Sequence, residues 1–345
     1  MSQPVLEVSD LTIQYSTDGG SVTAVSDASF TIDEGEYFGL VGESGCGKST
    51  VARAVIGGLD DNGQIKSGTI RVNGEEIQDY TTEEMNERVR WKDISFIPQS
   101  SMNNLDPLLR IEKQAQKLAD IHADMPPEEA SERLAEMFEI VGLSEARISE
   151  YPHQFSGGMQ QRAVIALALF LDPDLIVADE PTTALDVIMQ DQMFKYLDKV
   201  REELDTSMML ITHDVSLIYE NCDKLAIMHS GQVAEYGYTD TVLAEPRHPY
   251  SIQLKQAFPD VHNPDKDLAT VKGSPPKTMG EVDYCTFVDR CPWATEDCSE
   301  HAPSQQEIGD GSLHTAACFR LDEVYRDRYD GEPALQDQQN QGSDL

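Results

Sequence analysis

The stretch "GESGCGKST" at residues 42–50 has the residue types and spacing of a loop that binds phosphate groups. It matches G-x-x-x-x-G-K-[S/T] directly after a predicted strand, which is the context that this motif requires. Successive backbone N–H groups can surround phosphate oxygens there, at the start of a helix whose dipole favours anions. We expect Lys48 to reach the β and γ phosphates of a nucleoside triphosphate and Ser49 to hold Mg²⁺. The other positions predicted to line this site are Gly42, Glu43, Ser44, Gly45, Cys46, Gly47 and Thr50, and Cys46 is interpreted as a small residue without a redox role.

The segment "DLIVADE" at residues 174–180 supplies two acids at the end of a predicted buried strand. Asp179 is placed to hold Mg²⁺, and Glu180 is a candidate base for the water that attacks the γ-phosphate. Two acids at a strand end are common in an acidic chain and would mean little alone. Because Lys48 lies upstream in a matching loop, we interpret the pair as the second half of a nucleotide site.

A second possible anion site lies in "FSGGMQQR" at residues 155–162, directly before a predicted helix. Ser156, Gly157 and Gly158 would leave backbone N–H groups free for a phosphate at the helix start. One nucleotide does not need two such sites. We therefore expect this loop to contact a nucleotide bound to a second subunit.

In this order, these motifs resemble the ATP-binding subunits of ABC transporters, over residues 5 to about 320. Phe155 departs from the usual leucine of the family's signature loop. The resemblance implies that Gln99 in "FIPQ" contacts Mg²⁺ and the attacking water and marks the permease contact, and that Asp186 links the two sites of a dimer. It further implies that His213 in "ITHD" contacts the γ-phosphate and that Tyr15 stacks on adenine.

Within this family, "NNLDP", "YPHQFSGG", "HPYSIQLKQAFP" and "GSPP" look like the importers of dipeptides and oligopeptides. The implied partners are two membrane permeases, a second ATP-binding subunit that is identical or related, and an extracellular solute-binding protein. Relatives in this branch also import nickel or oligosaccharides, so the cargo stays open. A soluble ABC ATPase acting on DNA or ribosomes is the competing class, but such proteins usually carry a coiled-coil insertion or two cassettes.

Four of the six cysteines, Cys285, Cys291, Cys298 and Cys318, occur close together near the C-terminus. Disulfides are disfavoured in a reduced cytoplasm, and four free thiols explain the clustering poorly. Structural zinc usually takes closer pairs than these, whereas wider spacing suits a four-iron, four-sulfur cluster. The resemblance agrees, since some members of the peptide-importer branch bind such a cluster. The prediction is therefore a 4Fe-4S centre with a structural role, with Zn²⁺ as the alternative.

The elements that must position these residues alternate between strand and helix, which predicts an α/β fold with a mostly parallel sheet. Buried strands are predicted at "DLIVAD" and "SMMLIT", and a hairpin is predicted to turn at Ser230 and Gly231. A helix is predicted to start at Pro126 and Pro127, to place Leu134, Met137 and Val141 on one face, and to stop at Gly142. The resemblance implies the P-loop NTPase ABC ATPase fold: a RecA-like core, an antiparallel β subdomain and a helical subdomain. Pro-rich sequence after Glu245 predicts a change to loops. The expected divisions are a nucleotide-binding domain over residues 1–245, with its helical subdomain at about 100–162, a small loop-rich C-terminal domain over 246–329, and a polar tail over 330–345.

The chain of 345 residues carries 62 acidic and 26 basic side chains, a net charge of −36. This charge argues against nucleic acid as a partner, because phosphate contacts need basic side chains. Its longest apolar run, residues 163–171, is far shorter than the roughly 20 residues that cross a bilayer. The N-terminus has no pattern of a secretory signal, so we expect the chain to stay in the cytoplasm. The resemblance implies a peripheral position on the cytoplasmic face of the membrane. Acids spread over the whole chain predict a salt-rich cytoplasm, and hence a haloarchaeal source.

Overall fold

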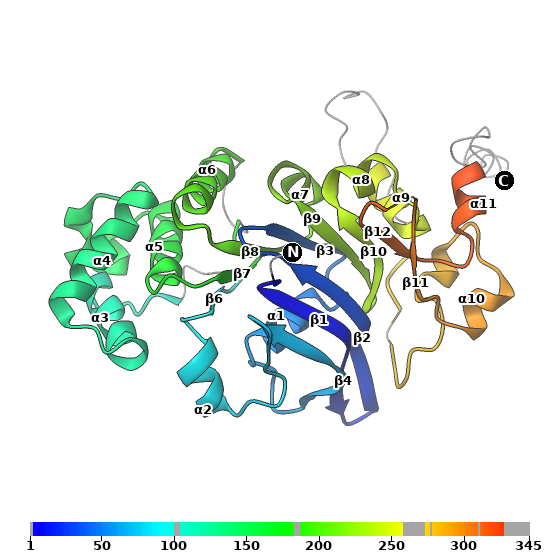
Figure 1. The fold of residues 1–345 in the computed structure, drawn as a ribbon, viewed down its shortest axis with the longest axis horizontal. Helices are drawn as coiled ribbons and strands as arrows, with labels where there is room; N and C mark the ends of the chain where they lie inside the picture. The colour runs from blue at the N-terminus through cyan, green and yellow to red at the C-terminus, as the bar shows by residue number, and fades with distance from the viewer. Residues whose placement is uncertain are drawn as a thin grey trace, which may run out of the picture.

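The computed structural model describes residues 3–99, 104–182, 187–257, 273–276, 278–309 and 311–327. Asp186 and the predicted polar tail lie outside these ranges. Figure 1 shows two sheets near the centre of the described chain, with helices on both sides of the larger one.

The larger sheet has eight strands in the order β11-β12-β10-β9-β3-β8-β7-β6. The five strands from β9 to β6 are parallel, and β10, β12 and β11 continue the sheet in antiparallel pairs. The prediction of a mostly parallel sheet is confirmed. The strand bounds are β3 (Tyr37–Gly42), β6 (Ile94–Ile97), β7 (Leu175–Asp179), β8 (Ser207–Thr212), β9 (Lys224–His229), β10 (Gln232–Tyr238), β11 (Gln305–Glu307) and β12 (His314–Ala317).

The central strands are buried on both faces, since every residue of β3, β7, β8 and β9 is buried. A strand covered on both faces needs apolar side chains at successive positions, not at alternate ones. This explains the short apolar runs "LIVAD" and "SMMLIT", which the sequence predicts to be buried strands. The hairpin predicted to turn at Ser230 and Gly231 joins β9 to β10.

The smaller sheet is antiparallel, with the strand order β2-β1-β4-β5. Buried and partly exposed residues alternate along much of β1, as expected when one face packs on a core and the other meets solvent. Its apolar face shares a core with α1 and with one face of the larger sheet. The bounds are β1 (Leu6–Thr17), β2 (Gly20–Ile32), β4 (Gly63–Val72), β5 (Glu75–Glu76) and α1 (Lys48–Val55).

A second core joins the other face of the larger sheet to a group of helices, α3 to α5, at the left of Figure 1. The helix predicted after Pro126 is α4; it begins at Pro127, and Gly142 follows its end with a left-handed φ of 67°. Leu134, Met137 and Val141, predicted to share a face, are all fully buried. The bounds of these and the remaining helices before β9 are α2 (Thr82–Glu84), α3 (Ile111–His122), α4 (Pro127–Ile140), α5 (Gly157–Leu169), α6 (Val187–Leu204) and α7 (Val215–Asn221).

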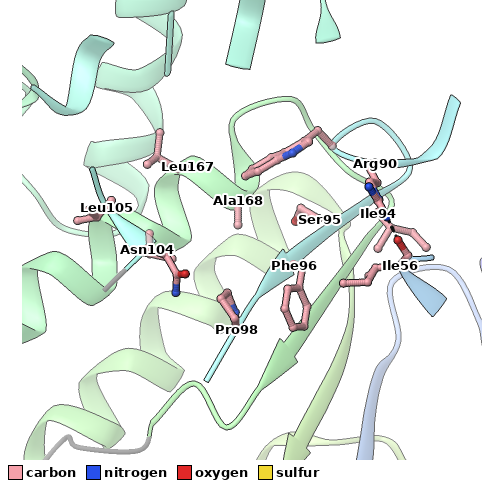
Figure 2. Close-up of a pocket in the computed structure, with 12 residues that line it drawn as sticks. Ile56, Arg90, Ile94, Ser95, Phe96, Pro98, Asn104, Leu105, Leu167 and Ala168 are labelled. Atoms are coloured by element: carbon pink, nitrogen blue, oxygen red, sulfur yellow. Dashed lines mark hydrogen bonds between the residues drawn. The ribbon is translucent and has the colours of Figure 1, made fainter. Parts of the chain in front are cut away.

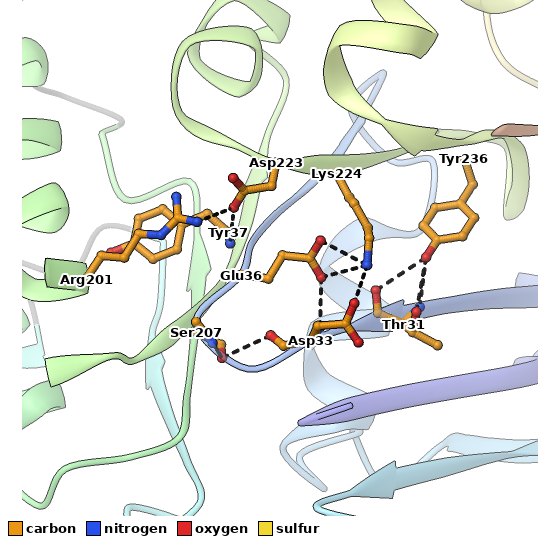
Figure 3. Close-up of polar contacts among 10 residues, drawn as sticks. Thr31, Asp33, Glu36, Tyr37, Arg201, Ser207, Asp223, Lys224 and Tyr236 are labelled. Carbon is orange, nitrogen blue, oxygen red and sulfur yellow. Dashed lines mark hydrogen bonds and ion pairs between the residues drawn. The ribbon is translucent and has the colours of Figure 1, made fainter. Parts of the chain in front are cut away.

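A group of charged side chains ties the starts of β3 and β9 together (Figure 3). Lys224, at the first position of β9, donates hydrogen bonds to Asp33 (2.7 Å) and Glu36 (3.0 Å). Its side chain is only 4% exposed. Burial alone lowers the pKa of Lys224, but hydrogen bonds from its ammonium to the two carboxylates outweigh this effect and raise it. The ammonium therefore stays charged inside the protein.

The chain after Glu245 contains more regular structure than its composition predicts. Besides loops, it forms α9, α10, α11 and the two strands that extend the larger sheet through β10. Strands of three and four residues leave no detectable periodicity, and they form here because β10 offers them an unpaired edge. The bounds are α8 (Thr239–Ala244), α9 (Pro249–Gln256), α10 (Glu296–Glu300) and α11 (Leu321–Tyr325). The predicted domain division at Glu245 stays a prediction.

Glu235 in β10 anchors this last part of the chain and is fully buried. It accepts hydrogen bonds from the backbone N–H groups of Arg247 (2.8 Å) and His248 (2.9 Å). It also contacts Nε2 of His314 in β12 at 2.7 Å.

In the described part of the chain, no helix is both long and apolar enough to cross a membrane.

Candidate functional site

The phosphate loop connects the end of β3 to the start of α1, as the sequence predicts. Gly42 approaches the next strand so closely that a Cβ atom would lie 2.2 Å from the carbonyl oxygen of Met228. Gly47 precedes α1 with a left-handed φ of 109°. Both positions therefore require glycine, and together they curve the backbone around the place where phosphate oxygens would lie.

Lys48 begins α1 and folds back over the loop. Its Nζ donates hydrogen bonds to the carbonyl oxygens of Gly42 (2.8 Å) and Glu43 (3.0 Å), and the residue is 6% exposed. Cys46 is buried beside it, and burial raises the pKa of its thiol. The interpretation of Cys46 as a small residue without a redox role stays a prediction.

Asp179, the last residue of β7, faces Ser49 of the phosphate loop. It is 6% exposed, and its Oδ1 atom has no hydrogen-bond partner. Burial raises the pKa of Asp179, while a hydrogen bond with Ser49 and the charge of Lys48 act in the opposite direction. A buried oxygen without a partner, next to a hydroxyl group, is a donor set that suits Mg²⁺. The residues present therefore fit the predicted ion.

Glu180 lies between the two other predicted catalytic side chains. Nε2 of Gln99 donates a hydrogen bond to Glu180 Oε2 (3.3 Å), and Nδ1 of His213 lies 3.0 Å from Oε1. The side chain of Glu180 is 18% exposed, whereas that of His213 is 65% exposed. Glu180 also has a left-handed φ of 47°, which is unusual for a non-glycine residue and occurs most often at functional sites.

The parallel sheet explains why these residues meet. Gln99 follows β6, Glu180 follows β7 and His213 follows β8, and these three strands are neighbours in the sheet. Because parallel strands all end at the same edge, residues 33 to 81 positions apart in the chain come into contact there. The phosphate loop follows β3, the next strand along this edge.

Three other parts of the predicted nucleotide site have no described contact with the cluster around Glu180. Ser156 precedes α5 on the helical side of the molecule and is exposed, as is Gly157. Tyr15 lies in β1, paired with Val22 and Gly63 in the smaller sheet. Asp186 lies outside the described residues. The roles predicted for them stay predictions.

A mostly apolar pocket of about 270 Å³ lies near Gln99, between β6 and α5 (Figure 2). Pro98, the neighbour of Gln99, lines it, together with Phe96 of β6 and Leu167 of α5. Ser95 contributes a buried hydroxyl group that has no hydrogen-bond partner. This pocket is smaller than most ligand sites, which span roughly 300–1,000 Å³, and suits protein side chains better than a cofactor.

The four clustered cysteines come together around one cavity. Burial raises the pKa of Cys291 to about 12 and that of Cys318 to about 11, and neighbouring thiols add to both shifts. Burial also raises the pKa of Cys285. In the described ranges, however, no three Cys, His, Asp or Glu side chains are arranged to hold a single metal ion. The thiols thus share a cavity without forming the tight geometry of a zinc site.

Sequence reasoning missed two residues that contact the phosphate loop from the C-terminal part of the chain. The hydroxyl oxygen of Tyr250 accepts a hydrogen bond from the backbone N–H of Glu43 (3.1 Å). Arg290 binds the side chain of Glu43 through both of its terminal nitrogens. The only signal in the sequence is a basic residue directly before Cys291, which does not indicate a partner 247 residues away.

Comparison with known proteins agrees with this geometry. A family model described as ABC transporter matches residues 25–183, and one described as oligopeptide/dipeptide transporter, C-terminal region, matches residues 234–298. The oligopeptide transport ATP-binding protein OppD of Salmonella typhimurium is 41% identical over 318 residues, which cover 92% of this chain and 93% of that protein. The OppD protein of Escherichia coli is 42% identical with the same coverage.

Solved structures show the same fold. A dimeric structure of the ATP-binding cassette MJ0796 bound to ADP and Pi is 28% identical, with a TM-score of 0.60 over 68% of this chain and 98% of that chain. The structure of cbiO1 from Clostridium perfringens is 25% identical, with a TM-score of 0.60 over 74% and 94% of the two chains. With its phosphate loop, its paired acids and these relatives, the chain belongs to the ABC transporter family and is one of its ATP-binding, ATP-hydrolysing subunits.

Proposed function

We propose that ATP hydrolysis by this subunit drives the import of dipeptides or oligopeptides through a membrane transporter. The cargo assignment is supported by the relatives, whose names specify oligopeptide transport, and by the family model matched at residues 234–298. The observation that carries the ATPase part is the contact of Gln99 and His213 with Glu180, beside Asp179 and the phosphate loop.

In this proposal the phosphate loop binds the triphosphate through its backbone N–H groups and through Lys48. Ser49, Asp179 and Gln99 would hold Mg²⁺, which neutralises charge on the phosphate oxygens when it is bound. The ammonium group of Lys48 is already held within the loop by carbonyl oxygens. A bound triphosphate would replace these carbonyl contacts with contacts to its β and γ phosphates.

Glu180 acts as the general base for the attacking water. Gln99 and His213 each contact one of its two carboxylate oxygens, so they fix the direction in which the carboxylate accepts a proton. A base held in place by two neighbours loses little freedom when the reaction begins, and such positioning is a large part of catalysis.

The complete site forms between two ATP-binding subunits. The exposed loop of Ser156, Gly157 and Gly158 supplies the phosphate contacts from the second subunit, and Asp186 links the two sites. This explains why a helix start suited to anions is exposed on the helical side of the molecule. The dimeric state of the similar cassette MJ0796 supports the arrangement.

The apolar pocket beside Gln99 is the docking site for a permease segment. It is lined by β6, which leads directly to Gln99, and by α5, which begins at the loop of Ser156. A segment that presses into this pocket would therefore touch the elements that carry two parts of the nucleotide site (Figure 2).

The four thiols around the shared cavity hold a four-iron, four-sulfur cluster. Such a cluster binds one thiolate at each iron, so its ligands lie farther apart than the ligands of one zinc ion. All four side chains line one cavity, so each could reach one iron, but this cavity of about 10 Å³ must widen to admit the cluster. The cluster's role is structural, because metal ligation adds folding free energy where a chain segment has little apolar core.

Elemental analysis of anaerobically purified protein tests the cluster. We expect about four irons per chain and a brown colour that fades in oxygen, and replacement of Cys298 by Ser should remove the iron. Cys222→Ser is the matched control, since Cys222 lies in the core outside this cavity. A colourless protein with about one zinc would support the alternative ion instead.

The cellular location, the partners and the domain division of the subunit follow from the same assignments. The subunit lies on the cytoplasmic face of the membrane, bound to two permeases, with a solute-binding protein on the outer side. The net charge of −36 supports a cytoplasm rich in salt and a haloarchaeal source. Residues 1–245 form the ATPase domain, and residues 246–329 form the C-terminal domain of this importer branch.

Transport by the reconstituted complex tests the proposal. Vesicles that contain the subunit, its permeases and its solute-binding protein should take up oligopeptides only with ATP, and Glu180→Gln should abolish the uptake. Uptake of nickel or an oligosaccharide instead would retain the ATPase assignment and overturn the cargo. ATP hydrolysis that does not respond to permeases would favour a soluble ABC ATPase.

A further inference from the structure

The segment that carries two of the cysteines also contacts the phosphate loop, and we call residues 285–291 the cysteine segment. Its residue Arg290 ends a short 3-10 turn, Val288–Arg290. The guanidinium group donates to Glu43 through both terminal nitrogens, at 2.7 Å to Oε2 and 2.9 Å to Oε1. The side chain of Arg290 is 6% exposed and that of Glu43 is 25% exposed. This is a forked ion pair in a largely dry environment.

The imidazole of His229, the last residue of β9, supports the guanidinium. Arg290 Nη1 donates to His229 Nε2 (3.1 Å), and Nδ1 of His229 lies 3.0 Å from the hydroxyl oxygen of Thr286. Burial and the charge of Arg290 lower the pKa of His229 to about 3, so the ring is neutral and Nε2 accepts. Thr286 in turn donates to the carbonyl oxygen of His229 (3.2 Å). All of these polar atoms have consistent donor and acceptor roles.

Packing holds the same residues in place. The ring of Phe287 lies against those of His229 (centroids 5.2 Å apart) and Tyr250 (5.4 Å), and the Arg290 guanidinium lies 5.5 Å from its centroid. Tyr250 also accepts a hydrogen bond from the backbone N–H of Glu43. Glu43 is thus fixed from the C-terminal part of the chain at both its backbone and its carboxylate.

A carboxylate in a phosphate loop raises an electrostatic problem, because it repels the triphosphate that the loop binds. Pairing with a guanidinium that donates to both carboxylate oxygens offsets this repulsion and fixes the position of the carboxylate. We infer that Arg290 is a positioning residue of the nucleotide site, which makes the affinity for a nucleoside triphosphate depend on the cysteine segment. Any ligand that holds Cys285 and Cys291 therefore also holds Arg290 against Glu43. The inference rests on the proposed role of the phosphate loop.

Equilibrium binding of a fluorescent ATP analogue to the full chain tests this inference. Arg290→Gln should weaken binding about tenfold or more, because Glu43 is left uncompensated beside the phosphates. The double variant Arg290→Gln/Glu43→Gln should recover most of the affinity that Arg290→Gln loses, because no uncompensated carboxylate then lies beside the phosphates. A double variant that binds as weakly as Arg290→Gln would overturn the inference, since the carboxylate would then not be the cause.

Two further readouts separate positioning from a general structural role. The loss in Arg290→Gln should shrink as KCl rises, because salt screens the repulsion, and in steady-state hydrolysis KM should rise with kcat nearly unchanged. If Arg290→Gln does not fold, Arg290→Lys replaces it in this experiment. The lysine ammonium keeps the positive charge but cannot donate to both carboxylate oxygens of Glu43 in the same fixed geometry. Binding of the nucleotide equal to that of the parent would then contradict the role of the two-nitrogen contact. Arg247→Gln, which removes an arginine stacked on Tyr325, is the matched control.

Lys48→Ala separates a failure of this inference from a failure of the proposed function. If this variant binds the analogue as tightly as the parent, the loop is not the phosphate site. If it loses binding while Arg290→Gln retains full affinity, only the inference about Arg290 is wrong.

Discussion

Glu180 is the residue on which the chemistry of this subunit depends most directly. Its two carboxylate oxygens contact Gln99 and His213, and its neighbour Asp179 has a buried oxygen without a partner. Each of these side chains has an ordinary structural explanation when it is considered alone. Their meeting at one edge of the sheet makes a catalytic explanation the stronger one.

We predict that Glu180→Gln leaves ATP binding intact and lowers turnover by a factor of about 10² to 10³. The amide has the same shape as the carboxylate but cannot accept the proton of the attacking water. Binding is measured with a fluorescent ATP analogue and turnover by phosphate release in the presence of the permeases. Glu220→Gln, which removes an exposed acid from α7, is the control. Normal turnover in Glu180→Gln would show that another group is the base.

Asp93, directly before β6, gives a pH-dependent prediction. Burial and the carboxylates of Asp174 and Glu75 raise its pKa from 3.8 to about 6. The charged form is therefore disfavoured in the folded protein, so Asp93 destabilises the fold above pH 6, and this cost disappears as pH falls through 6 toward 4. Asp93→Asn should raise the free energy of unfolding by about 1 kcal/mol at pH 7.5, with allowance for solvent screening of a half-buried group.

Thermal melts of Asp93→Asn at pH 7.5 and pH 5, at one fixed KCl concentration, measure this difference. The gain in Tm at pH 5 should be about half of the gain at pH 7.5, because pH 5 lies midway between the two pKa values of Asp93. Asp120→Asn, which removes one exposed acid from α3, is the comparison. Equal gains in both variants at each pH would mean that net charge, and not the surroundings of Asp93, explains the effect.

Strands β3 and β9 are joined at their first residues by an ion cluster as well as by backbone hydrogen bonds. Lys224 in β9 bridges Asp33 and Glu36, which lie in and after the turn that follows β2 (Figure 3). Both strands lead to the site at their other ends, where β3 runs into the phosphate loop and β9 ends at His229, which supports Arg290. The cluster therefore holds the framework of the site from the far edge of the sheet.

We predict that Lys224→Met lowers the free energy of unfolding by about 3–5 kcal/mol, because Glu36 would remain buried without a counter-charge. Chemical denaturation measures the loss. The double variant Lys224→Met/Glu36→Gln leaves no unpaired charge on Glu36 and should recover part of it. A double variant less stable than Lys224→Met would show that packing around the lysine stem, and not charge pairing, is the main contribution.

The molecule as a whole carries 62 acidic against 26 basic side chains, and its net charge of −36 opposes folding by self-repulsion. Stability should therefore rise steeply with KCl. Screening is nearly complete at about 1 M, where the Debye length is about 3 Å, so any gain beyond that point reports specific ion or hydration effects. Thermal melts that stay flat between roughly 0.1 and 3 M KCl would remove the argument for a salt-rich cytoplasm.

Local sequence determined the elements and the motifs of this protein. The apolar runs of β7 and β8 and the proline and glycine that bound α4 are visible because each depends on residues next to one another in the chain. The phosphate loop is equally local, since its glycines and Lys48 act within nine residues. For the same reason the ATPase fold and the family resemblance follow from the amino-acid sequence by itself.

Tertiary structure alone decided which distant residues touch. Strands β11 and β12 form because the edge of β10 is open to them, and their own three or four residues contain no signal for it. Glu180 contacts the side chains of Gln99 and His213 because three parallel strands end side by side. Arg290 reaches Glu43 across 247 residues only after the cysteine segment packs on the end of β9. Such contacts depend on the packing of the whole chain, so no local pattern of residues encodes them.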